Sequence, residues 1–157
     1  EISACLVGSE MCIRDSAEEL YCIAPSSSGK VRISQELIER GDFFLKMNGN
    51  AVFKHAIVRF LEVIQEALAF NQLTKDDIDL LVPHQANLRI SQYIQQKLEL
   101  PDEKVFNNIM HLGNTTAGTI PIALSQAWEQ GRLKENDLIC LAAFGSGFSW
   151  ASALLKW

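Results

Sequence analysis

Two polar motifs in this sequence each follow a short apolar run, and together they could stabilise negative charge on a substrate oxygen. The first, covering residues 82–87, reads VPHQAN, and the second, covering residues 113–118, reads GNTTAG. Histidine and asparagine side chains can both donate hydrogen bonds to an oxyanion or an enolate. If each motif follows a strand, His84 and Asn114 can converge on one oxygen atom. The pair therefore predicts an oxyanion or enolate site.

Apolar periodicity predicts the elements that must position this pair. From Asn50 onward, apolar residues recur at three- and four-residue steps, which predicts an amphipathic helix of about 20 residues. The other predicted elements are a capped turn over 74–77, a buried strand over 78–82 that Pro83 ends, a helix over 87–98, a short strand over 105–109, a helix over 116–130, a strand over 137–143, a tight turn over 144–148 and a strand over 149–157. This order predicts an α/β fold, with helices flanking a mixed sheet and a C-terminal strand hairpin.

The N-terminal part of the sequence has a weaker pattern. Residues 1–16 show no sustained periodicity, and Met11–Ser16 resembles translated sequencing-adapter sequence, which favours a non-native origin for this end. Residues 25–29 predict a loop. Residues 30–34 alternate like a short strand or lead into the polar stretch at 36–40. We therefore treat residues 1–46 as a separate segment with no predicted fold.

Composition argues against several functional classes. Hydrophobic residues make up 48% of the chain and charged residues 21%, which is typical of a globular protein with a sizeable core. The net charge of −5, with no offsetting basic stretch, argues against a nucleic-acid-binding protein. No apolar run reaches the roughly 18 residues needed to cross a membrane, and no secretory signal pattern is present. We expect a cytoplasmic protein that binds neither nucleic acids nor membranes.

The cysteines and histidines do not form a metal-binding pattern. The cysteines are Cys5, Cys12, Cys22 and Cys140, and no two of them have Cys-x-x-Cys spacing. Cys140 lies in an apolar run, which predicts a buried and inert thiol. The histidines outside the first motif lack acidic or cysteine partners at ligand spacing. The sequence therefore predicts no metal site.

Four segments in this order resemble the C-terminal half of the β-ketoacyl-acyl-carrier-protein synthase III family. They cover residues 47–54, 82–90, 113–118 and 143–150. The resemblance implies a thiolase-like fold built of two similar halves, with residues 47–157 forming the C-terminal domain. It also implies an acyltransferase that joins an acyl group from acyl-CoA to malonyl-acyl carrier protein, with loss of carbon dioxide, to start fatty-acid synthesis. No cofactor is expected, because the CoA thioester and the phosphopantetheine-carrier protein are substrates. The complete enzyme is expected to be a homodimer.

The same resemblance implies roles for individual residues. His84 and Asn114 would hold the malonyl thioester carbonyl and stabilise the enolate that decarboxylation leaves. The backbone N–H of Ser146 matches a donor to the acyl oxyanion, although the family usually has glycine or another small residue there. Substrate- or CoA-binding positions are implied at Asn50, Asn87 and Phe144. A basic patch that receives the acidic carrier protein is implied at Lys54, Arg89 and Lys97, and helix spacing places the last two on one helix face.

The nucleophilic cysteine of the family has no convincing match in this sequence. The segment Ser3–Gly8 resembles the family's cysteine motif only faintly, and too few residues separate Cys5 from His84 to hold the rest of a first half. We therefore expect this chain to supply the His/Asn pair without the nucleophile and to be inactive alone. Two alternatives stay open. One is a related condensing enzyme of specialised metabolism, and the other is a non-catalytic or split-subunit module that binds acyl carrier protein.

Overall fold

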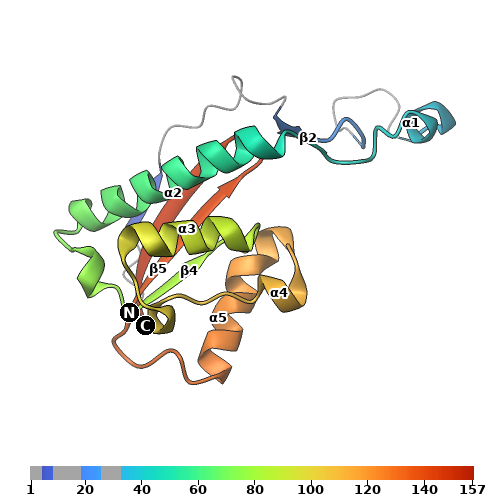
Figure 1. The fold of residues 1–157 in the computed structure, drawn as a ribbon. Helices are drawn as coiled ribbons and strands as arrows, with labels where there is room; N and C mark the ends of the chain where they lie inside the picture. The colour runs from blue at the N-terminus through green and yellow to red at the C-terminus, as the bar shows by residue number, and fades with distance from the viewer. Residues whose placement is uncertain (1–4, 9–18, 26–32) are drawn as a thin grey trace.

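The main body of the chain is a four-stranded sheet with helices on both faces (Figure 1). The computed structural model describes residues 5–8, 19–25 and 33–157. The strand order is β1, β6, β5, β4, with bounds β1 Cys5–Gly8, β6 Ser149–Lys156, β5 Leu138–Gly145 and β4 Leu80–Pro83. β4 and β5 are parallel, whereas β6 is antiparallel to both β5 and β1. The predicted mixed sheet with a C-terminal hairpin is therefore confirmed.

One face of the sheet is covered by α2 (Gly49–Phe70) and α3 (Leu88–Leu98). These two helices confirm the predictions made from Asn50 onward and over 87–98. Because apolar residues recur at three- and four-residue steps, each helix presents one apolar stripe to the sheet. The stripes pack against alternate strand residues in the larger core cluster, whose buried members include Phe60, Ile64, Ile94, Cys140 and Leu154.

The opposite face is covered by α5 (Thr119–Glu129), which packs on β4 and β5 in a second apolar cluster. Leu80 and Val82 belong to this cluster, whereas Leu81 between them belongs to the cluster under α2 and α3. Strand side chains alternate between the two faces of a sheet, so β4 is buried on both sides. This double burial explains why the strand is continuously apolar.

Short helical turns connect the longer elements. They are η1 Lys75–Asp77, η2 Asp102–Lys104, α4 Ile109–Leu112 and η3 Thr116–Gly118. The predicted capped turn is confirmed, because Thr74 and Asp77 form a capping box at η1. The helix predicted over 116–130 starts as the 3-10 turn η3 and continues as α5. In the described part of the chain, no helix is both long and apolar enough to span a bilayer.

The prediction of a short strand over 105–109 is wrong beyond Val105. Val105 makes one parallel bridge with β4, and the chain then enters α4 at Ile109. The N–H groups of Asn108 and Ile109 donate to the side-chain oxygen of Gln85, at 3.0 and 3.2 Å. Because these groups are engaged by a side chain, they cannot extend a strand ladder.

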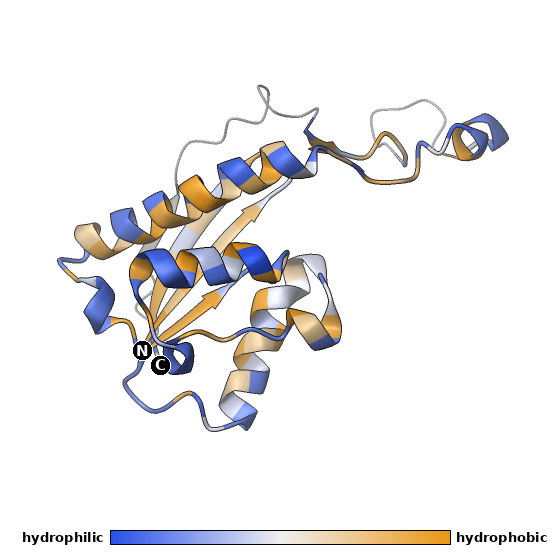
Figure 2. Ribbon diagram, viewed as in Figure 1, coloured by the Kyte–Doolittle hydropathy of each residue, from blue (hydrophilic) through white to orange (hydrophobic). Residues whose placement is uncertain are grey.

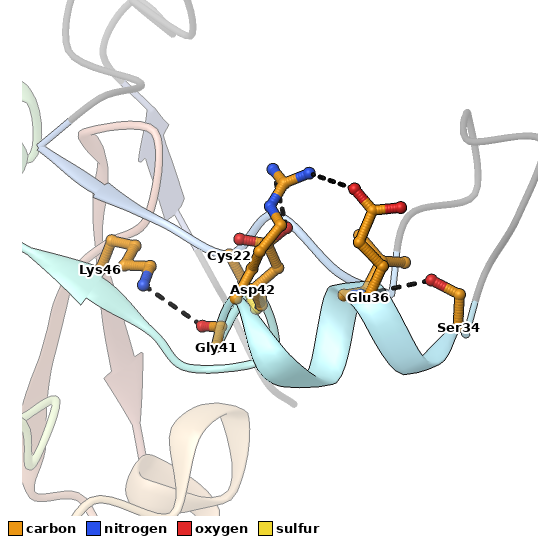
Figure 3. A network of polar contacts seen from close by, with 8 residues as sticks. Cys22, Ser34, Glu36, Gly41, Asp42 and Lys46 are labelled. Carbon is orange, nitrogen blue, oxygen red and sulfur yellow. Dashed lines mark hydrogen bonds and ion pairs between the residues drawn. The ribbon is translucent and has the colours of Figure 1, made fainter.

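The described residues 19–25 and 33–48 form an arm that extends from the main body (Figure 1). Its elements are β2 Leu20–Tyr21, α1 Gln35–Glu39 and β3 Lys46–Met47. After α1, Arg40 pairs with Asp42 at 3.0 Å and Lys46 donates to the Gly41 carbonyl at 3.2 Å (Figure 3). Figure 2 colours parts of the arm as hydrophobic. The exposed apolar residues of the arm include Ile33, Ile38, Phe44, Leu45 and Met47.

Several N-terminal predictions fall outside the described residues. They are the predictions for residues 1–16 apart from those in β1, for most of the loop at 25–29, for most of the segment at 30–34, and for Cys12. Within the described part, β1 pairs with β6, an element that the sequence pattern did not predict. The polar stretch at 36–40 overlaps α1, which Ser34 caps through a 3.2 Å hydrogen bond from the Leu37 N–H.

Candidate active site

His84 and Ser146 lie at the edge of the sheet where the parallel strands β4 and β5 end. His84 follows β4, and the turn with Ser146 follows β5. α2 and α3 lie side by side, and both begin at this edge (Figure 1). In α/β sheets, ligands bind beyond the carboxyl ends of parallel strands. The N-terminal ends of helices also carry partial positive charge, which favours an anionic substrate at this edge.

His84 is held at the end of β4 by its backbone and by its ring. Its N–H donates to the Ala142 carbonyl at 2.7 Å, which continues the pairing of β4 with β5. Its Nδ1 lies 2.5 Å from Thr119 Oγ1, at the start of α5. The ring is half-buried, and burial lowers the pKa of His84 below the ordinary histidine value. The imidazole is therefore neutral at pH 7, with Nε2 as the ring nitrogen left for a substrate.

Asn114 is exposed, and its side chain is oriented by the loop that carries it. Gly113, at φ +69° and ψ −164°, ends α4 and turns the chain toward Asn114. Asn114 Oδ1 accepts a hydrogen bond from the Thr116 N–H at 2.8 Å. Since an N–H can pair only with the amide oxygen, this contact fixes which way the amide faces. Its Nδ2 donates to no partner among the described residues and can serve a ligand.

A short series of contacts joins His84 to Asn114. Thr119 touches His84 through its hydroxyl and also donates to the Thr116 carbonyl at 3.0 Å. The N–H of Thr116 in turn donates to Asn114. Thr116 has φ +55°, a left-handed conformation that is unfavourable for a β-branched residue. Hydrogen bonds on both sides of Thr116 hold it in this conformation, so the two motifs have a defined relative placement.

Two supporting residues, Thr119 and Gln85, are not among the site residues predicted from the sequence. Thr119 reaches His84 across 35 residues, and no local pattern signals that contact. Gln85 is 2% exposed and donates to the carbonyls of Pro83 and Phe106, at 2.8 and 3.3 Å, while its oxygen accepts from the start of α4. A polar residue directly beside the candidate histidine was the available signal for Gln85.

Ser146 lies at the exposed tip of the β5–β6 hairpin. Its hydroxyl donates to the Leu20 carbonyl at 3.0 Å, which links the hairpin to the arm. Its backbone N–H donates to no acceptor among the described residues, so it can serve an oxyanion. Phe144, by contrast, is 5% exposed and packs with Phe148 and Trp150 beneath α2. Its contact with substrate stays a prediction.

Asn50 and Asn87 lie at the starts of the two helices on this face. Asn87 Oδ1 accepts from the Arg89 N–H at 2.9 Å and caps α3, which leaves its Nδ2 facing an exposed surface. Asn50 is exposed in the first turn of α2. Both amides therefore lie near the carboxyl edge of the sheet, as substrate-binding groups would, and their contact with substrate stays a prediction.

The three basic residues predicted to form one patch are divided between two ends of the helix pair. Lys54 and Arg89 are exposed near the starts of α2 and α3. Lys97 lies in the last turn of α3, above the Tyr93 ring, and about 12 Å along the helix from Arg89. Only Lys54 and Arg89 are thus close to the candidate site edge.

None of the cysteines with a described position lies beside His84. Cys5 is in β1, three strand spacings or about 14 Å across the sheet from β4. Cys22 is in the arm, where its thiol approaches the Ala24 carbonyl at 2.8 Å. Cys140 is buried, and burial raises its pKa to about 12, so its thiol is inert. Within residues 5–8, 19–25 and 33–157, no group of three or more metal-binding side chains gathers.

Comparison with known proteins places this fold and these motifs beside one enzyme family. The family model for the C-terminal part of 3-oxoacyl-[acyl-carrier-protein] synthase III matches residues 68–157. A β-ketoacyl-[acyl-carrier-protein] synthase III of Roseiflexus sp. (strain RS-1) is 40% identical over 154 residues, or 98% of this chain and 45% of the relative. One from Campylobacter jejuni (strain 81116) is 51% identical over 112 residues, or 71% of this chain and 35% of the relative.

A solved structure supports the same relationship. The β-ketoacyl-[acyl carrier protein] synthase III of Thermus thermophilus is 38% identical and superimposes with a TM-score of 0.78, covering 99% of this chain and 45% of that chain. The α/β fold expected for the C-terminal half of this family is thereby confirmed. The chain spans less than half the length of each of these relatives.

Proposed function

Because this chain belongs to the C-terminal family of 3-oxoacyl-[acyl-carrier-protein] synthase III, we propose that it supplies the malonyl-binding part of a decarboxylating condensing enzyme. The complete enzyme joins an acyl group from acyl-CoA to the malonyl group on acyl carrier protein, to start fatty-acid synthesis. The observation that carries the proposal is the contact series His84–Thr119–Thr116–Asn114, because it gives the two motifs a defined relative placement at a substrate-accessible edge.

The proposed role of the pair is to stabilise an enolate. Loss of carbon dioxide from a malonyl thioester leaves electrons on the neighbouring carbon and negative charge on the thioester oxygen. His84, through Nε2, and Asn114, through Nδ2, donate hydrogen bonds to that oxygen. Donors that are already oriented lower the barrier without reorganising during the reaction, and losing one typically slows catalysis by about 10²–10³-fold.

The nucleophile comes from another part of the enzyme in this proposal. The positions of Cys5, Cys22 and Cys140 support this assignment, since none lies beside His84. The Ser146 N–H then donates to the acyl oxyanion formed at that nucleophile. Without that nucleophile, the described residues cannot carry an acyl group.

The proposed docking site for acyl carrier protein is the edge marked by Lys54 and Arg89. Both side chains are exposed near the starts of α2 and α3, the end at which a phosphopantetheine arm would enter in this proposal. Basic side chains attract an acidic partner and speed its association even on a protein of net negative charge.

The experiment that tests the proposal is a chimera in which this chain replaces the matching part of the Roseiflexus relative. Release of labelled carbon dioxide from malonyl-acyl carrier protein measures decarboxylation. We expect His84→Ala and Asn114→Ala each to lower this rate by about 10²–10³-fold. His111→Ala, which changes an exposed histidine of α4, is the matched control and should leave the rate unchanged.

Two results would contradict the proposal. Undiminished decarboxylation in both the His84 and Asn114 variants would show that the pair does not stabilise the enolate. A folded chimera that binds malonyl-acyl carrier protein but releases no carbon dioxide would instead point to a binding module. Circular dichroism of each variant separates these outcomes from a failure to fold.

A further inference from the structure

We propose that Thr119 is a positioning residue that keeps the proton of neutral His84 on Nδ1, so that Nε2 is a hydrogen-bond acceptor in the resting site. This inference rests on the proposed function, because it concerns how His84 serves that reaction. It follows from the two contacts of one hydroxyl group, which lies 2.5 Å from His84 Nδ1 and 3.0 Å from the Thr116 carbonyl oxygen.

The direction of these hydrogen bonds follows from the donors that are present. A hydroxyl has one hydrogen to donate, and a carbonyl oxygen can only accept. If Thr119 donates to Thr116, the short contact with His84 is a hydrogen bond only when Nδ1 carries the hydrogen. The reverse arrangement, with Thr119 donating to Nδ1, would give up the side-chain bond to Thr116.

The surroundings favour the arrangement in which Thr119 donates to Thr116 and Nδ1 of His84 carries the hydrogen. Thr119 is 2% exposed, so its hydroxyl has little access to solvent as an alternative partner. His84 is neutral because burial disfavours its charged form, and a neutral imidazole carries a hydrogen on only one nitrogen. With that hydrogen on Nδ1, Nε2 presents a lone pair to the substrate edge.

When Nε2 carries no hydrogen, a proton transfer to His84 must come before His84 can stabilise the enolate. Nε2 cannot donate to an enolate oxygen until it gains a proton. A thiol nucleophile placed beside Nε2 can supply that proton: the S–H bond breaks, an N–H bond forms at Nε2, and sulfur keeps the electron pair as a thiolate. The thiolate attacks the carbonyl carbon of acyl-CoA, and CoA leaves with the electron pair of the broken C–S bond, as a thiolate that takes a proton from solvent. The imidazolium keeps its proton and donates from both nitrogens, to Thr119 and to the malonyl thioester oxygen. After loss of carbon dioxide, the enolate carbon bonds to the acyl carbon, and the bond from that carbon to the enzyme's sulfur breaks. When the condensed product leaves the sulfur, the proton returns to the thiolate.

The first test reads the tautomer directly. Nitrogen-15 NMR of the labelled imidazoles distinguishes protonated from bare ring nitrogens. The chain has three histidines, so the spectrum of His84→Gln identifies the signals of His84. We expect Nδ1–H and bare Nε2 in the wild type and in Thr119→Ser, which keeps the hydroxyl. In Thr119→Val, and in the smaller Thr119→Ala, the hydrogen should move to Nε2. A wild-type spectrum with Nε2–H, or variants without a shift, would overturn the inference.

The second test separates the two steps in the chimera. Acylation of the nucleophile by acyl-CoA needs Nε2 as an acceptor, and losing such a base typically slows a step by at least about 10²-fold. Thr119→Val should therefore slow acylation by about that factor while malonyl decarboxylation falls much less, because Nε2–H can still donate. Thr119→Ser should restore both rates. Equal losses in both steps would reduce Thr119 to a structural role. A wild-type chimera that performs neither step would contradict the proposed function and leave the NMR result standing.

Discussion

The buried side chain of Gln85 accepts a hydrogen bond from the backbone of Asn108 at 3.0 Å, and this contact ties the end of β4 to the start of α4. The same amide also pairs with the carbonyls of Pro83 and Phe106. The nitrogen and the oxygen of the Gln85 side-chain amide are therefore both used inside the protein. The residue before it is His84, so the placement of the candidate histidine depends on this buried amide.

Replacing Gln85 with leucine should destabilise the protein strongly. The change leaves buried N–H and carbonyl groups without partners, and each such group costs about 1–3 kcal/mol. We expect the free energy of unfolding in urea to fall by at least about 2 kcal/mol. Gln96→Leu, at an exposed position of α3, is the matched control and should change it by less than about 0.5 kcal/mol. Equal effects of the two substitutions would contradict the interpretation.

Gly113→Ala should disturb Asn114 through the backbone. At φ +69° and ψ −164°, Gly113 occupies a region that is accessible almost only to glycine. A side chain there costs about 1–3 kcal/mol, although no atom stands in its way. The thermal unfolding temperature and the decarboxylation rate of the chimera should both fall. Gly49→Ala, in the first turn of α2 with equally open space, should be neutral or slightly stabilising.

The pH dependence of stability should report the buried position of His84. Because the pKa of His84 is lowered on folding, the unfolded chain binds more protons just below the ordinary histidine value of about 6.5. The free energy of unfolding should therefore fall as pH drops through this region. His84→Gln should flatten the decline measured by urea unfolding between about pH 7.5 and 5. His111→Gln is the comparison, and an equal pH slope in the wild type and His84→Gln would argue against burial as the cause.

Charge reversal should separate the basic residues near the site from Lys97. Lys54→Glu and Arg89→Glu are expected to slow association with acyl carrier protein, most clearly at low salt. Lys97→Glu, at the far end of α3, should have a smaller effect. Stopped-flow association rates at several salt concentrations provide the measurement. If Lys97→Glu has the largest effect, the carrier protein docks at the other end of the helix pair.

The sequence predicted the long elements better than the short ones. α2 and α3 have strong helical periodicity and asparagine caps, so local information defines them. The segment at 105–109 has the apolar content of a strand, but a buried glutamine from elsewhere engages its backbone. The residues of a segment do not reveal that a side chain from elsewhere will bind its backbone, because the partner residue lies more than twenty positions away.

In the candidate site, too, local motifs could be predicted, whereas contacts between distant residues could not. His84 and Asn114 could be proposed because each lies in a recognisable motif after an apolar run. Thr119 could not be, since its importance arises only when α5 packs beside the end of β4. Which end of α3 lies at the substrate edge also needed the structure, and this orientation is what places Lys97 away from the site.

The parallel pairing of β4 with β5 has a consequence for how the protein folds. These neighbours in the sheet are far apart in the chain, as the bond from the Leu138 N–H to Asp79 shows by spanning 59 residues. Closing such a long loop is slow, and contacts of this kind form late in folding. The β5–β6 hairpin with Ser146 can meet His84 only after that closure. The substrate edge should therefore appear together with the complete sheet, and a partly folded intermediate should have none of its chemistry.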